Sequence, residues 1–135
     1  MIDILTHVYN LLKADERLSQ KVSSNDIKFN KTPDAQNLLQ PTIIIDDYDD
    51  PTPETHADGD RIAYNYAFQI DVYVNVSKKY NARILRNEIS NLISEILWNA
   101  DKIKLVANLG NDFNSQFSLY RSTRRYEAIF YNDEY

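Results

Sequence analysis

The sequence predicts an α+β fold: a two-layer sandwich in which two helices pack on one face of a mainly antiparallel sheet, with a long β-hairpin projecting from it. Large apolar side chains occupy every even position from Ile62 to Val76, and most odd positions between them are small or polar. This alternation is the period of a strand with one buried face. Two other stretches repeat their apolar residues at intervals of three and four, as amphipathic helices do. The order helix, strands, helix, strands then gives two helices on one sheet, in a single domain spanning residues 1–135.

The first helix is expected within residues 2–18, where apolar side chains recur at helical spacing and Asp3 can serve as the N-cap. A short strand is expected at residues 27–30. A further strand is expected at residues 41–48, because a proline followed by a β-branched run is typical of the start of a strand.

Residues 49–60 are expected to form an acidic loop of about twelve residues, because they combine two prolines, a glycine and many carboxylates. The strands on either side can pair as neighbours, so residues 41–76 should form an extended hairpin with an acidic tip. The strand after the loop is longer than most. Its second half, residues 68–76, is assigned to the core. Its first half, residues 61–67, displays Tyr64 and Tyr66 without obvious cover and is where a neighbouring subunit is expected.

After Val76 the apolar period changes to about 3.6, which predicts a second helix that covers the even face of the long strand. Ser77 is its expected N-cap and Asn99 its expected end, with Trp98 as a core residue. The remaining strands are expected at residues 103–107, before a turn at Gly110, and at residues 117–121 and 125–131, which are joined or interrupted near Ser122.

Composition excludes several classes of function. The chain has no cysteine, which excludes disulfides, thiolate metal sites and a cysteine nucleophile. The net charge of -5 opposes a broad electrostatic grip on DNA or on an anionic membrane. The sequence shows no basic leader and no apolar run of the roughly 18 residues that a membrane span needs. We therefore expect a protein without a membrane partner, made in a cytoplasm.

No enzyme chemistry can be assembled from the remaining inventory. His7 and His56 are the only histidines, and two glycines cannot build a phosphate cradle. The carboxylates of residues 46–60 could in principle bind calcium or magnesium, but their spacing does not fit an EF-hand loop. We therefore expect no catalytic residue, no cofactor and no metal, and the acidic loop is expected to meet a basic partner instead.

The candidate functional residues are therefore those of a subunit interface. An acidic tip and a basic cluster near the C-terminus could pair between copies, although the basic cluster with Tyr120 and Tyr126 could also contact DNA. The interface candidates are Asp47, Asp49, Asp50, Tyr64, Tyr66, Arg121, Arg124 and Arg125.

Several segments together resemble a known family. They are the Pro41-Thr-Ile strand, the acidic loop, the segment Phe68-Gln-Ile-Asp-Val-Tyr73, the helix containing Ala82, Leu85, Ile89 and Leu92, and the late Leu119-Tyr-Arg121. In this order they resemble the tail-terminator proteins of long-tailed bacteriophages, also called tail-completion or head-tail joining proteins.

The resemblance implies a virion protein of the head-proximal end of the tail, assembled in the host cytoplasm. It implies a ring, usually a hexamer, that stops polymerisation of the tail tube protein and docks the head connector or head-completion protein, while DNA passes through the lumen without specific binding. Two alternatives remain at this stage. One is another neck or tail ring component, such as a head-completion or tube protein, and the other is a small metal-binding domain built on the acidic loop.

Overall fold

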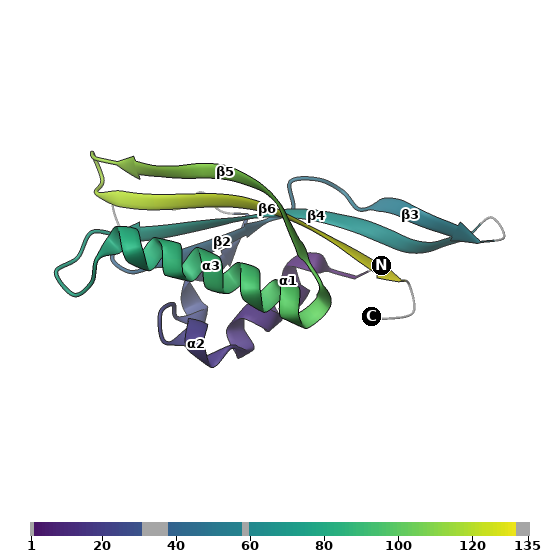
Figure 1. The fold of residues 1–135 in the computed structure, drawn as a ribbon, viewed down its shortest axis with the longest axis horizontal. Coiled ribbons are helices and arrows are strands. Elements are labelled where there is room, and N and C mark those ends of the chain that lie inside the picture. Colours follow the sequence, from purple (N-terminus) through teal and green to yellow (C-terminus); the bar gives the residue numbers. More distant parts are fainter. Residues whose placement is uncertain (1, 31–37, 58–59, 132–135) are drawn as a thin grey trace.

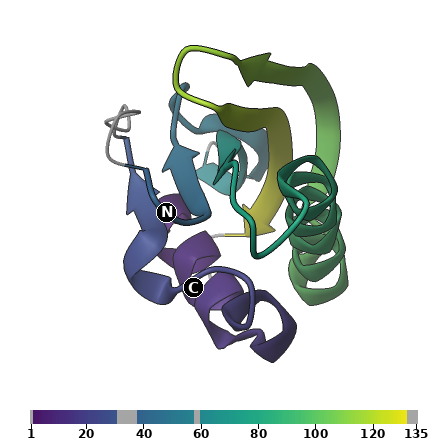
Figure 2. The same cartoon turned by 90° about the vertical axis from the view of Figure 1, so that its left-hand side faces the viewer.

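The computed structural model describes residues 2–30, 38–57 and 60–131, and it confirms the predicted α+β class. Figures 1 and 2 show one curved sheet with the helices packed on one of its faces. The helices are α1 (Ile4–Ala14), α2 (Glu16–Ser19), a 3-10 turn (Ser24–Asp26) and α3 (Ala82–Asp101). The strands are β1 (Ile27–Phe29), β2 (Thr42–Asp46), β3 (Thr52–Ala57), β4 (Asp60–Asn75), β5 (Lys104–Asn114) and β6 (Leu119–Tyr131).

Strand β4 is the centre of the sheet, whose order is β1-β2-β4-β6-β5. On one side β4 pairs with β6 from Ala63 to Asn75. On its other side it pairs first with β3 and then, further along, with β2. All these pairs are antiparallel, and only β1 and β2 run parallel. The unusual length of β4 is therefore used within one chain, because three strands share its two edges.

The predicted hairpin is present, but the predicted loop is wrong over Thr52–Ala57, which form β3 and pair with the start of β4. Figure 1 shows this pair projecting from one end of the molecule. Its turn, residues 58–59, lies outside the described residues. Prolines are tolerated in a strand at a sheet edge or at a bulge. Strand β3 has both features, because its register shifts beside Pro53 and again beside Thr55.

The predicted buried face of the long strand is confirmed from Tyr66 to Val74, but the assignment of Val76 to the core is wrong, because β4 ends at Asn75 and Val76 is 53% exposed. Phe68, Ile70, Val72 and Val74 are at most 2% exposed and belong to one core with both helices. The largest contributions from the other elements are Val8 and Leu12 of α1, Ile43 and Ile45 of β2, Ile89, Ile93 and Leu97 of α3, and Tyr126 of β6.

Side-chain caps set the ends of the helices. The carboxylate of Asp3 accepts a hydrogen bond from the backbone N–H of Thr6, as predicted for an N-cap. Asp15 in turn caps α2, so the predicted single helix is split in two. Helix α3 begins after Asn81, whose side chain accepts from Ile84, and not at Ser77. It ends at Lys102, which adopts the left-handed conformation with φ 56°.

Two predictions for the C-terminal half of the chain are wrong, those for Trp98 and for Gly110. Trp98 is 48% exposed and is not a core residue. Gly110 does not end a strand: with φ 112° it sits at a register shift inside β5, which continues to Asn114. A glycine with positive φ is the usual residue of such a bulge. Strand β6 is continuous through Ser122, because β4 and β5 hold it from both sides.

Candidate assembly surfaces

Four carboxylates lie at the end of β2 and in the connection to β3, those of Asp46, the last residue of β2, and of Asp47, Asp49 and Asp50; we call residues 46–50 the acidic segment. Asp47, Asp49 and Asp50 are exposed. None of the four makes an ion pair within the part of the chain that the structure describes. Asp50 donates its backbone N–H to the side chain of Asp49 at 2.9 Å, which keeps this short stretch turned. The negative charge of the acidic segment is therefore available to a binding partner.

The structure does not bring the three candidate arginines together. Side chains alternate along a strand, so Arg121 and Arg125 of β6 lie on the face away from the helices and Arg124 lies on the helix face. Arg121 forms an ion pair with Asp71 at 3.2 Å. Arg125 donates Nε–H to the side-chain oxygen of Gln69 at 3.1 Å. These arginines form separate local contacts and not one basic patch.

The two arginines on the outer face are held by their own strand neighbours. Burial alone would lower the pKa of Arg121, but the charge and hydrogen bond of Asp71, together with Tyr73 and Asp112, outweigh this and raise it. The guanidinium of Arg125 lies 4.2 Å from the ring centroid of Tyr48, within the acidic segment. Arg125 therefore ties the acidic segment to the outer face of the sheet in the same copy.

Arg124 joins the sheet to helix α3. Its Nη1 donates to the backbone oxygen of Ser90 at 3.2 Å and to Ser94 Oγ at 3.0 Å. Its Nη2 donates to Asn91 Oδ1 at 3.0 Å. The hydroxyls of Ser94 and Tyr126 are 2.6 Å apart, and burial raises the pKa of Tyr126. We call this row of polar contacts the α3–β6 seam.

Arg86 closes the same seam nearer the start of α3 and is only 6% exposed. It donates to the backbone oxygens of Asp112 and Arg121 at 3.4 and 3.5 Å, and to the side-chain oxygen of Asn87. Burial lowers the pKa of Arg86. Neither Arg86 nor Arg124 has a carboxylate within ion-pair distance among the described residues. The seam therefore carries positive charge that its own neighbours do not neutralise.

Arg86 is not among the residues that the sequence analysis singled out. The usable signal was the spacing of Arg86, Ser90 and Ser94, four residues apart, which forms a polar row beside the apolar one. A row of small hydroxyl residues on a helix flank indicates close approach to another element.

The two candidate tyrosines of the long strand, Tyr64 and Tyr66, do not form an uncovered pair. Tyr66 is 2% exposed, its hydroxyl accepts the backbone N–H of Ile2 at 2.9 Å, and its ring packs against Phe130. Tyr64 is half-buried beside the core. The expectation that Tyr66 lacks cover within the chain is wrong, because the N-terminal residues reach across to it.

Strand β5 forms an edge of the sheet and has only one pairing partner, β6, within the described chain. Leu105, Val106, Leu109 and Phe113 are each between 43% and 52% exposed. We call β5 with these side chains the β5 edge. A long edge strand presents unpaired N–H and C=O groups, and apolar side chains add a surface that a partner can cover.

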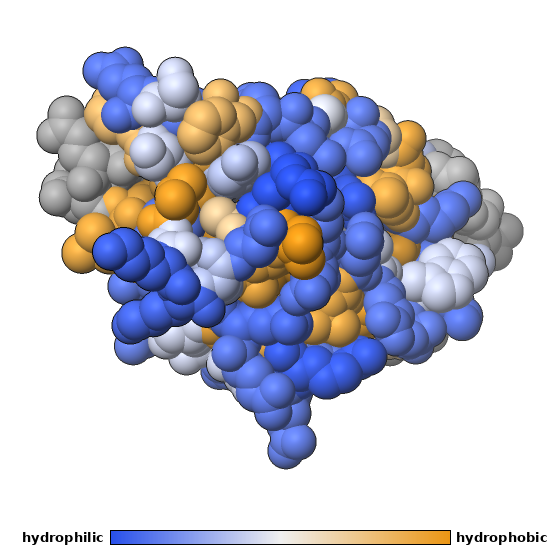
Figure 3. Space-filling view, turned by 60° about the vertical axis from the view of Figure 1, so that its left-hand side comes forward, coloured by the Kyte–Doolittle hydropathy of each residue, from blue (hydrophilic) through white to orange (hydrophobic). Residues whose placement is uncertain are grey.

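Other apolar side chains are exposed at the end where β4 stops. Leu39 is 77% exposed and Val76 is 53% exposed, beside Phe117. Figure 3, in which this end is turned toward the viewer, shows apolar areas separated by polar ones. This pattern is typical of several small contact areas and not of one large hydrophobic face.

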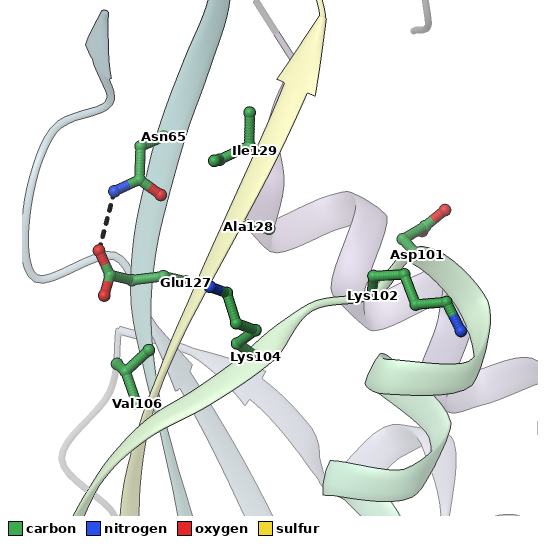
Figure 4. Close-up of a pocket in the computed structure, with 8 residues that line it drawn as sticks. All are labelled: Asn65, Asp101, Lys102, Lys104, Val106, Glu127, Ala128 and Ile129. Carbon is green, nitrogen blue, oxygen red and sulfur yellow. Dashed lines mark hydrogen bonds between the residues drawn. The ribbon is translucent and has the colours of Figure 1, made fainter. Parts of the chain in front are cut away.

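A shallow hollow of about 330 Å³ lies where α3 ends and β5 begins. It is drawn in Figure 4, where the side-chain N–H of Asn65 in β4 donates to the carboxylate of Glu127 in β6 at 2.8 Å. The side chain of Lys104 extends from β5 toward β6. Its lining residues are Asn65, Asp101, Lys102, Lys104, Val106, Glu127, Ala128 and Ile129. Close by, His7 Nε2 lies 2.6 Å from Asp101 Oδ2 and so joins α1 to the end of α3.

Within residues 2–30, 38–57 and 60–131, no group of three or more histidine, cysteine, aspartate or glutamate residues is arranged to hold a metal ion. No helix within these ranges is long and apolar enough to cross a membrane. The candidate assembly surfaces are the acidic segment, the α3–β6 seam and the β5 edge.

Comparison with known proteins gives a likeness of fold. The chain superposes on a chain of the structure titled "Virion of native gene transfer agent (GTA) particle" with a TM-score of 0.62 and 16% identity, covering 96% of this chain and 95% of that one. A second solved chain aligns over 98% of this chain and 99% of its own, at 12% identity, with a TM-score of only 0.45. No protein-family model and no curated protein matches the sequence. The chain thus shares its α+β fold, over nearly its whole length, with a chain of a gene transfer agent virion.

Proposed function

We propose that the protein is a structural subunit of a phage-like virion, and specifically a tail terminator. In this role it forms a ring, usually a hexamer, at the head-proximal end of the tail tube, ends polymerisation of the tube protein and joins the tail to the head connector or head-completion protein. The observation that carries the proposal is the fold likeness to a chain of a gene transfer agent virion, which spans 96% of this chain. The sequence segments that resemble tail terminators support the position at the head-proximal end of the tail.

The surfaces support a ring in physical terms. A ring built from identical copies needs two different, complementary surfaces on each copy, so that one copy binds the next. This chain has an unpaired strand edge on one side and an exposed acidic segment on the other side of β4. The chain needs no catalytic centre for such a role.

The charge distribution also supports a lumen through which DNA passes without being held. The net charge is -5. Of the basic residues first considered for DNA contact, Arg121 is paired with Asp71, Arg124 is bound to α3, and Arg125 is stacked on Tyr48. A negative surface repels phosphates and lowers non-specific binding to DNA.

The test is electron microscopy of the purified tail tube protein that is encoded in the same genome, assembled with and without this protein. We expect tubes that end in a ring at one extremity and that stop growing when the protein is added during assembly. A tube subunit would lengthen the tubes instead, and a head-completion protein would bind connectors but not tubes. A protein that remains monomeric at all concentrations in native mass spectrometry would contradict the ring itself.

A further inference from the structure

We propose that the β5 edge of one copy binds the acidic segment of a second copy, with the cationic residues beside β5 as the matching charge. The inference rests on the proposed ring and names the two surfaces that close it. The occupant of the β5 edge is therefore a second copy of this chain.

The apolar part of the surface is the β5 edge itself. Its exposed apolar side chains are Leu105, Val106, Leu109 and Phe113, and Trp98 at the end of α3 is 48% exposed. Interfaces are enriched in aromatic residues at their centres. Within β5 only Lys104 and Asp112 are charged, so little charge would have to be desolvated when the edge is covered.

Cationic side chains accompany β5 from one end to the other. Lys102 and Lys104 stand at its start, and both are exposed. Near its end, the exposed Arg83 lies close to Arg86, which reaches the backbone of Asp112. None of these three exposed cations, Lys102, Lys104 and Arg83, makes an ion pair among the residues that the structure describes, whereas Arg86 and Arg124 are held by hydrogen bonds within the chain.

Helix α3 separates its charges between its two flanks, with Arg83 and Arg86 toward β5 and Glu88 and Glu95 away from it, while the carboxylates on the β5 side are those of Asp101, Asp112 and Glu127. On the flank facing α1 and α2, Glu88 pairs with Lys21 and Glu95 pairs with Arg17, both at 3.2 Å. These carboxylates are therefore neutralised on the far flank and do not balance the cations beside β5. An acidic partner is the occupant that this arrangement favours.

The acidic segment has the matching properties and the right position. Its carboxylates are without ion pairs in the described chain, and it follows β2, on the other side of β4 from β6 and β5. The two surfaces lie toward opposite edges of one sheet, so they suit contact between different copies. Head-to-tail contact of two different surfaces is the heterologous geometry that generates rings.

The test reverses charge on each surface separately, in the full chain. One variant is Lys102→Glu with Lys104→Glu, and the other is Asp47→Lys with Asp50→Lys; all four side chains are exposed, and circular dichroism checks that each variant is folded. We expect each variant alone to self-associate with a dissociation constant raised by about tenfold or more, measured by sedimentation velocity. A 1:1 mixture should assemble again, because each reversed surface then meets its reversed counterpart and each native surface meets a native one.

The matched control is Lys78→Glu with Lys79→Glu, which makes the same charge change at two exposed lysines outside β5 and α3. It should assemble like the wild type. Trp98 is the only tryptophan, and its ring centroid lies 5.0 Å from the Lys102 ammonium at the proposed interface. Because Trp98 is 48% exposed, its fluorescence emission should shift to shorter wavelength when wild-type copies assemble and cover the ring.

The outcomes separate this inference from the proposed function. If wild-type rings form and both reversal variants assemble normally, the ring stands and the β5 edge is not its interface. If each variant dissociates but the mixture does not reassemble, the two surfaces do not bind each other, and the inference is overturned. If the wild type itself never self-associates, the proposed ring fails together with the inference.

Discussion

Replacing Phe68 with alanine should lower the free energy of unfolding by about 3–5 kcal/mol, the usual cost of truncating a large buried aromatic residue. Phe68 is 0% exposed at the centre of β4. Its ring stacks on Tyr126 of the neighbouring strand, with centroids 5.6 Å apart and planes inclined by 16°. Both the lost apolar burial and the remaining cavity contribute to the loss.

Urea denaturation followed by circular dichroism measures this loss, at one fixed protein concentration because self-association adds to apparent stability. The control is Phe113→Ala on the β5 edge, where the side chain is 47% exposed. It should cost less than about 1 kcal/mol, while weakening self-association if the β5 edge is an interface. Equal losses for the two variants would mean that the core is not centred on β4.

The core could be predicted from the sequence because its signal is periodic and long. The alternation from Ile62 to Val76 assigns each side chain to a face without reference to any other element. The same applies to the apolar row of α3. Burial depends mainly on these periods, so Phe68, Ile70, Val72 and Val74 were assigned to the core correctly.

The ends and connections of the strands were harder, because they depend on pairing partners. Prolines and carboxylates at residues 49–60 indicate a loop locally, yet the free edge of β4 pairs with Thr52–Ala57. Gly110 indicates a turn locally, yet β6 continues opposite it and turns the glycine into a bulge. In both cases tertiary pairing overrode local propensity.

The candidate surfaces were predicted in part. The exposed acidic residues Asp47, Asp49 and Asp50 follow from composition. The grouping of Arg121, Arg124 and Arg125 did not hold, although the alternation of β6 already separates the middle arginine from the other two. The β5 edge could not be predicted, because an edge is a property of the strand order and not of the strand itself.

Replacing Arg124 with alanine should cost about 2–3 kcal/mol of folding stability, because hydrogen bonds from a charged group are worth more than neutral ones and two of its three partners are partly buried. Arg124 gives three such bonds to α3, to Ser90, Ser94 and Asn91. A role confined to contact between subunits would leave the stability of the monomer unchanged. Thermal unfolding of dilute, monomeric protein distinguishes the two roles.

Arg125→Ala is the matched control, one residue along the same strand and on the opposite face. It loses one hydrogen bond to Gln69 and the contact with Tyr48, whose side chain is 39% exposed, so it should cost only about 0.5–1 kcal/mol. Arg124→Lys should recover little of the loss, because a single ammonium cannot reproduce the forked geometry that reaches both Ser94 and Asn91. If the alanine variants at the two positions unfolded at the same temperature, Arg124 would not be the residue that fastens α3 to the sheet, and its free charge would be available to a partner after all.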